Sequence, residues 1–151
     1  MEKLINEMRQ WLTQEGFHVI RAMHNDTLPR LQNFLIAVGT GEIRTQDATV
    51  CDYLGKDAAG SLYYGRPLRA ELTFEVCSTW RQGAAGCDGA AVSLLKALRK
   101  DEAPFHCTDI SLGRTSFDPK ASCFRRTVTA AGPMWMYYAC RTAESGGEDE
   151  A

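Results

Sequence analysis

Apolar and polar positions alternate with two different periods along this chain, which predicts helices as well as strands. Near the start, apolar residues recur every three or four positions, which predicts an amphipathic helix over residues 2–15 with Gly16 as its C-terminal cap. A second helical pattern runs from Asp88, a candidate N-cap, to Lys100. Each helix has one apolar face that must be buried against another element.

The clearest strand in the sequence covers residues 68–80. Apolar residues alternate there with polar ones for a dozen positions, so one face is expected on a core and the other on a polar surface. The apolar set is Leu68, Ala70, Leu72, Phe74, Val76 and Trp80, and the polar set includes Arg69, Glu71, Thr73 and Glu75. Weaker patterns predict five further strands, at residues 17–23, 33–38, 48–54, 105–115 and 123–138.

Glycine, proline and small polar residues mark the breaks between these elements. The GTGE stretch at 39–42 is expected to end or kink its strand, and Gly132–Pro133 to interrupt the last one. Residues 55–67 hold three glycines and a proline and read as a loop or an extended hairpin. SFDPKAS at 116–122 is predicted to be a turn.

The strands are grouped along the chain and do not alternate with helices. This order favours an α+β fold, with a mostly antiparallel sheet and two helices packed on one face. We expect a single domain over residues 1–142. Residues 143–151 are acidic and lack large apolar side chains, so they are predicted to form a disordered tail.

Composition narrows the classes of function. The formal net charge of the 151 residues is -2, so the chain lacks the basic character typical of duplex-binding proteins. No run of apolar residues is long enough for a membrane helix, and the first residues do not resemble a secretory signal. The protein is therefore expected to fold where it is made, with its cysteines as free thiols: Cys51, Cys77, Cys87, Cys107, Cys123 and Cys140.

Candidate catalytic groups are present, but their spacing suits no known chemistry. His18, His24 and His106 lack a second metal ligand at a usual spacing. Glu71 and Glu75 share one strand face, roughly 13 Å apart, which is too far for a glycosidase pair. We therefore predict no catalytic residues, no metal and no cofactor, and we expect that the protein is not an enzyme.

Two long blocks carry a resemblance to a known family. They are DYLG…LYYGRPLRAELTFEV at 52–76 and ISLGRTSFDPKASCFRRTV at 110–128. With the order of predicted elements, they resemble the small tail-terminator or tail-completion proteins of long-tailed bacteriophages and related prophage elements. The resemblance spans residues 1–138, and its motifs are structural.

The resemblance implies a virion protein that is assembled in the cytoplasm of the bacterial host. Such subunits form rings, commonly hexamers, that cap the tail tube at its head-proximal end. The cap stops tube polymerisation and offers a joining surface to the head–tail connector. The implied partners are further copies of the chain, the tail tube protein and the connector, with DNA only as passing cargo in the lumen and no membrane.

Seven residues are predicted to contact a neighbouring subunit or the tube: Leu62, Tyr63, Tyr64, Arg66, Arg69, Glu71 and Glu75. The first three place apolar or aromatic side chains in a flexible segment, where such side chains tend to find a partner. Glu71 and Glu75 are expected to serve the assembled state rather than the fold. Two other functions stay open: a head-closure or connector subunit of the same particle, and a small cytosolic module that binds a ligand or a peptide.

Overall fold

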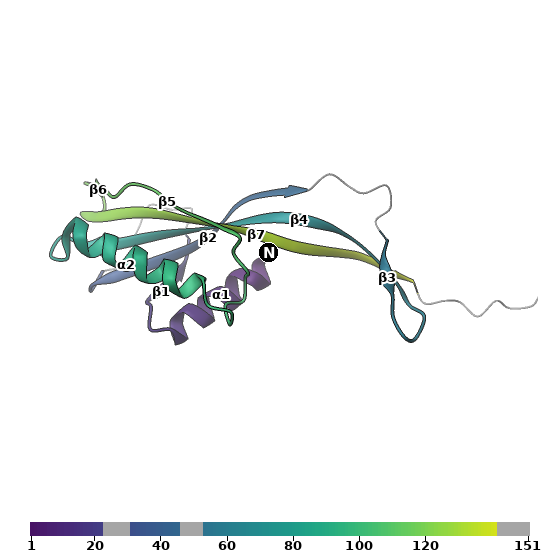
Figure 1. Cartoon of the computed structure of the whole chain (residues 1–151). Helices are drawn as coiled ribbons and strands as arrows, with labels where there is room; N and C mark the ends of the chain where they lie inside the picture. Colours follow the sequence, from purple (N-terminus) through teal and green to yellow (C-terminus); the bar gives the residue numbers. More distant parts are fainter. Residues whose placement is uncertain (23–30, 46–52, 142–151) are drawn as a thin grey trace, which may run out of the picture. The chain divides into compact units, whose positions relative to one another are not determined.

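The computed structural model describes residues 1–22, 31–45 and 53–141, the last six of these by their backbone alone (Figure 1). Its helices are α1 (Glu2–Gln14) and α2 (Gly83–Leu98). Its strands are β1 (Val19–Arg21), β2 (Phe34–Thr45), β3 (Tyr53–Lys56), β4 (Leu62–Thr79), β5 (Asp109–Leu112), β6 (Ser116–Asp118) and β7 (Cys123–Arg141). The predicted α+β class is confirmed, with a mostly antiparallel sheet and two helices on one face.

The seven described strands form one sheet in the order β1-β2-β4-β7-β5, with β3 paired to β4 and β6 paired to β7. β1 runs parallel to β2, with Val19 opposite Ile36. β3 is antiparallel to β4, and both β5 and β6 are antiparallel to β7. The short strands thus pair with longer ones: β1 with β2, β3 with β4, and β5 and β6 with β7.

The chain divides into two compact units. Unit 1 combines Met1–Ile43 with Ala70–Pro133, and unit 2 combines Arg44–Arg69 with Met134–Ala151. The predicted single domain over residues 1–142 stays a prediction. The predicted tail at 143–151 and most of the predicted strand at 48–54 lie outside the described residues.

The core of unit 1 lies between the helices and the sheet. The fully buried large side chains include Met8 and Leu12 of α1, Leu94 and Leu98 of α2, and Leu72, Phe74 and Val76 of β4. Each such side chain contributes about 1.5–3 kcal/mol when it leaves water. Lys100 forms an ion pair with Glu15 and so joins the C-terminal ends of the two helices. The two amphipathic faces predicted from the sequence are the faces that this core covers.

The GTGE stretch was expected to end or kink its strand, and it does not end it. β2 continues through it to Thr45. A Cβ atom at Gly39 would lie 2.9 Å from the Cβ of Ala22, and one at Gly41 would lie 2.4 Å from Oε1 of Glu71. The two glycines are therefore strand residues that let neighbouring side chains lie close over β2.

Helix α2 begins at Gly83, five residues before the predicted N-cap. Its N-cap is Gln82, without a side-chain hydrogen bond, and Asp88 lies inside the helix. The chain leaves β4 through a tight turn in which Gly83 has a φ of +65°, a conformation that glycine adopts readily. Ala84 and Ala85 favour helix, so the small residues that suggested a break form its first turn.

The C-terminal half of the sheet also differs from its prediction. β7 runs without interruption through Gly132–Pro133, where the missing side chain of Gly132 lets the carbonyl of His106 approach. The predicted strand at 105–115 shortens to β5 at Asp109–Leu112. Three residues of the predicted turn at 116–122 form β6, because they pair with β7 across a tight connection.

Candidate interaction surfaces

Unit 2 contains a β-hairpin made of β3 and the first residues of β4. Tyr53 pairs with Tyr64, and Lys56 pairs with Leu62. Residues 55–67 were expected to form either a loop or an extended hairpin, and the extended hairpin is confirmed. Leu62, Tyr63 and Tyr64 are therefore strand residues and not part of a flexible loop. The glycines at 60 and 65, which suggested a loop, lie on either side of this apolar run and do not interrupt it. The run itself therefore has the extended backbone of a strand.

Three large apolar side chains of this hairpin are exposed: Tyr53 by 44%, Leu54 by 38% and Tyr63 by 37%. We call these three residues the hairpin patch. The ring of Tyr53 also contacts the ring of Tyr64 edge to face, at 5.7 Å between centroids. The patch is thus an ordered surface and not a set of loose side chains.

The turn of the hairpin is held by Asp57. Its Oδ1 accepts hydrogen bonds from the backbone N–H groups of Ala59 at 2.9 Å and Ser61 at 2.8 Å. Its Oδ2 accepts one from the hydroxyl of Tyr63 at 3.0 Å. The pKa of Asp57 is lowered from 3.8, above all by the hydrogen bond from the Ser61 backbone, because these donors favour the charged carboxylate.

The seven residues predicted as an interface all lie on β4. Leu62, Tyr63, Tyr64, Arg66 and Arg69 belong to unit 2, whereas Glu71 and Glu75 belong to unit 1. The predicted alternation is confirmed over residues 68–76: Leu68, Ala70, Leu72, Phe74 and Val76 are buried, and the residues between them are half-buried. The polar face is therefore partly covered rather than open to water.

Neighbouring strands provide this cover. The carboxylate of Glu71 lies over Gly41 of β2. Burial lowers the pKa of the Arg125 guanidinium of β7, but the neighbouring Cys77, Glu75 and Asp118 raise it, and the net shift is upward. Arg125 also forms an ion pair with Asp118 at 3.2 Å. Charges on this face thus meet charges from adjacent strands.

A second aromatic surface, in unit 1, was not predicted. Trp80 was assigned to the buried face of its strand, but the strand ends at Thr79 and Trp80 is 68% exposed. Its ring stacks on Phe124 at 5.7 Å between centroids and meets Phe117 edge to face at 5.3 Å. We call Trp80, Phe117 and Phe124 the Trp80 cluster.

Local turns fix this cluster in place. The backbone N–H of Gly83 donates to the carbonyl of Trp80 at 3.2 Å, so the tryptophan lies at the corner between β4 and α2. Phe117 lies directly opposite Phe124 in the β6–β7 pair. Asp118 closes that pair by accepting hydrogen bonds from the N–H groups of Lys120 and Ala121. The exposed aromatic rings are therefore held by two tight turns.

The sequence did contain a signal for this surface. Phe117 lies within SFDPKAS, where most neighbours are polar or turn-forming, and Phe124 is followed by two arginines. Aromatic side chains in such positions have few apolar neighbours along the chain. That they contact one another and Trp80 depends on the pairing of β6 with β7, which the sequence did not predict.

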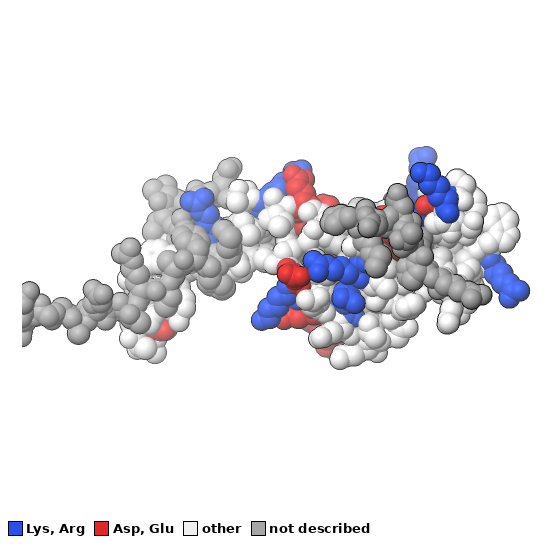
Figure 2. All heavy atoms as spheres, turned by 180° about the vertical axis from the view of Figure 1, so that it is seen from behind, with Lys and Arg blue, Asp and Glu red and all other residues white. Residues whose placement is uncertain are grey.

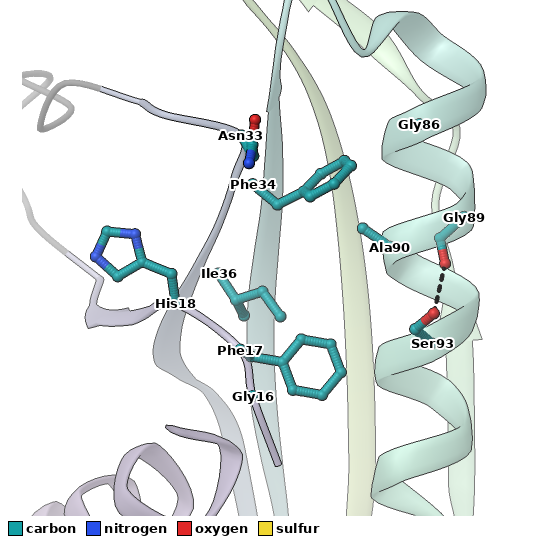
Figure 3. A pocket seen from close by; sticks show the side chains of 10 residues that line it. All are labelled: Gly16, Phe17, His18, Asn33, Phe34, Ile36, Gly86, Gly89, Ala90 and Ser93. Carbon is teal, nitrogen blue, oxygen red and sulfur yellow. Dashed lines mark hydrogen bonds between the residues drawn. The ribbon is translucent and has the colours of Figure 1, made fainter. Parts of the chain in front are cut away.

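A groove of about 650 Å³ lies beside α2 (Figure 3). Phe17, Phe34 and Ile36 point into it from one side, and the small residues of α2 form the other. The helix residues are Gly86, Gly89, Ala90 and Ser93. His18 points away from the helix, so the groove itself presents an apolar surface.

Two of the described thiols are poorly suited to nucleophilic chemistry. Burial raises the pKa of Cys77 to about 12 and that of Cys107 to about 11, so both stay protonated at neutral pH. Among residues 1–22, 31–45 and 53–141, no group of three or more histidine, cysteine, aspartate or glutamate side chains is placed to hold a metal ion. His24, Cys51 and Cys140 are outside the residues whose side chains are described.

Comparison of the sequence with protein-family models and with curated proteins finds no match. No helix of the described residues combines the length and the apolar character needed to cross a membrane.

Proposed function

We propose that this chain is a structural subunit that assembles head to tail into a closed ring. The observation that carries the proposal is the presence of two different exposed aromatic surfaces, the hairpin patch on unit 2 and the Trp80 cluster on unit 1. A head-to-tail contact requires two unlike surfaces on each copy, and it closes into a ring when the rotation fits. Exposed aromatic groups are typical of such contacts.

We further propose that the ring is a tail terminator of a long-tailed phage or a phage-tail-like particle. The sequence blocks at 52–76 and 110–128 support this role, and they include both aromatic surfaces except Trp80. The ring would cap the tail tube at its head-proximal end and present its other side to the connector. This role consists of binding and symmetry, so it requires no catalytic group.

The half-buried charges of β4 fit the same proposal. Glu71 and Glu75 would act in the assembled ring, at a subunit contact or along the lumen through which DNA passes. Surface ion pairs contribute only about 0–1 kcal/mol to folding, so such carboxylates can serve assembly at little cost to the subunit.

Electron microscopy of tail tubes tests the proposal. The tube protein of the same particle is polymerised alone and with the purified chain, and tube ends are imaged by negative staining. We expect rings on one end of each tube and tubes that stop growing. Rings that bind the connector but leave tube growth unchanged would instead indicate the head-closure role, and a chain that binds neither would contradict both.

A further inference from the structure

We infer that the Trp80 cluster binds single-stranded nucleic acid, with bases stacked on its exposed rings and phosphates paired with the cations around them. All residues of this site belong to unit 1. The inference goes beyond the proposed ring and does not depend on it. A ring contact would cover the same cluster, so the nucleic acid is expected on the unassembled subunit.

The rings of the cluster form a platform with an open face. Trp80 and Phe124 are stacked with 18° between their planes, and Phe117 meets these two rings at steep angles of 73° and 59°. Phe124 occupies one face of the indole, yet Trp80 is 68% exposed. The opposite face is therefore open to a flat aromatic group. A nucleobase can stack there whatever its identity, because every base has a π surface.

The chain around these rings is basic. Residues 79–89 and 113–127 contain five basic and two acidic residues, a formal charge of +3. Both acids are half-buried, and each forms an ion pair with an arginine of β7: Asp88 with Arg126, and Asp118 with Arg125. Arg125 also neighbours Glu75 of β4, which is half-buried too. The acids of this region are thus matched by the two arginines of β7.

Three further cations, Arg81, Arg114 and Lys120, are exposed. Arg81 comes directly after Trp80, and the other two lie three residues to either side of Phe117. They belong to three separate connections, β4–α2, β5–β6 and β6–β7. Figure 2 shows mostly blue charged side chains at the end of unit 1 where β6 lies. Cations spread in this way suit a chain of phosphates better than a single phosphate group.

Single-stranded nucleic acid is the partner that matches both features of the surface. An acidic peptide would pair with the cations but has no series of flat rings. A duplex keeps its bases stacked on one another, whereas an unpaired strand can place them on aromatic side chains. The formal charge of -2 for the whole chain argues against duplex binding but not against this local site.

Titration with oligonucleotides tests the inference. The chain is labelled with a fluorophore and kept below the concentration at which it assembles, and binding is followed by microscale thermophoresis. The probes are oligo(dT) and oligo(rU) of about 16 nucleotides, with a duplex of the same length for comparison. We expect both single strands to bind with Kd values of about 1–100 µM and the duplex to bind more weakly. The tighter of the two single strands identifies the polymer as DNA or RNA.

Variants of two tryptophans test the stacking. Trp80→Ala should weaken binding about 5- to 150-fold, the loss typical of one stacked base, and Trp80→Phe should keep most of the affinity because a ring remains. Trp135→Ala is the matched control, since Trp135 is 51% exposed and lies outside the cluster. It should bind as the parent does. Circular dichroism and thermal unfolding show whether each variant folds.

The salt dependence of binding tests the phosphate contacts. Each contact with a single strand contributes about -0.7 to the slope of log K against log salt, so three cations predict a slope of about -2. Arg81→Ala should make the slope shallower by about 0.7. Arg99→Ala, at the exposed C-cap of α2, should leave it unchanged. If Trp80→Ala does not fold, Arg81→Ala with Lys120→Ala decides the test by its affinity and its slope.

Three outcomes would overturn the inference. The first is a parent that binds neither single strand at about 500 µM, five times the weak end of the expected range. The second is a folded Trp80→Ala protein that binds as the parent does. The third is a duplex or an oligo-glutamate peptide that binds as tightly as the single strands, which would show a surface for charge alone. None of these results involves tube ends or rings, so the proposed function is tested separately.

Discussion

At the scale of single residues, two glycines with opposite surroundings give the sharpest test of packing. A methyl group at Gly132 would lie 2.1 Å from the backbone carbonyl oxygen of His106, so Gly132→Ala must displace either β7 or the segment before β5 that contains His106. We expect this change to lower the free energy of unfolding by about 1–3 kcal/mol. The measurement is urea unfolding followed by circular dichroism.

Gly89→Ala is the matched control. Nothing lies within 4 Å of a Cβ atom at Gly89, which is exposed inside α2. Alanine is favoured over glycine in a helix interior, so the change should raise the free energy of unfolding by about 0.8–1 kcal/mol. Equal effects of the two substitutions would contradict the packing described for Gly132.

Asp57 predicts a pH-dependent hairpin. Its pKa is lower in the folded protein than its ordinary value of 3.8, so the carboxylate stabilises the turn above that value. This stabilisation is lost as the pH falls below 3.8 toward the folded pKa. Protection of the Ala59 and Ser61 amides from hydrogen exchange, measured by NMR between about pH 6 and about pH 3, should fall with the pH. Asp57→Asn should remove this pH dependence, and unchanged protection in the parent would contradict the account.

At the scale of elements, Arg126 joins three parts of unit 1. Its Nη1 donates to Oδ1 of Asp88 in α2 at 2.8 Å, and its Nε donates to the carbonyl of Gly113 at 2.8 Å. The hydroxyl of Thr115 donates to the same carboxylate oxygen. The connection between β5 and β6 is thereby attached to the helix.

We therefore expect Arg126→Lys to loosen this connection although it keeps the charge. A lysine ammonium cannot reproduce both donors of the guanidinium in that geometry. Hydrogen exchange followed by mass spectrometry should become faster in peptides that cover residues 111–117 and stay unchanged in α1. Arg99→Lys, at an exposed position, is the control, and equal exchange in the two variants would argue against the role of Arg126.

Hydrophobic periodicity correctly predicted the elements that depend only on neighbouring residues in the sequence. The two helices and the alternation over 68–76 follow from spacing alone, and both are present. The errors arose where a residue's role depends on a distant segment. Gly41 reads as a break unless Glu71 is known to lie above it, and Asp88 reads as a cap unless Arg126 and Thr115 are known to reach it.

Of the two candidate surfaces, one lies close to a segment predicted from the sequence and the other depends on contacts between distant segments. The hairpin patch shares Tyr63 with the predicted interface, and its other two residues, Tyr53 and Leu54, lie on the strand that pairs with this segment. The Trp80 cluster brings together residues from 80 to 124, so it depends on the β6–β7 pairing and on where β4 ends. A pattern along the chain contains neither piece of information.

At the scale of the whole molecule, the proposed role of the β4 carboxylates in assembly can be tested separately from folding. Glu71→Gln with Glu75→Gln should leave the thermal midpoint nearly unchanged, because half-exposed charges contribute little to folding. Assembly into rings and capping of tubes should be impaired. Light scattering of the purified variant and imaging of tube ends measure the two effects, and a variant that caps as the parent does would show that these side chains serve only the subunit.

The central claim is that the chain closes into a ring through unlike surfaces. Native mass spectrometry of the purified protein over a range of concentrations tests it most directly, since a closed ring has a fixed number of subunits. We predict one dominant oligomer, six subunits by the resemblance to tail terminators, with little beyond it. A monomer at every concentration, or an open-ended series of oligomers, would contradict the claim.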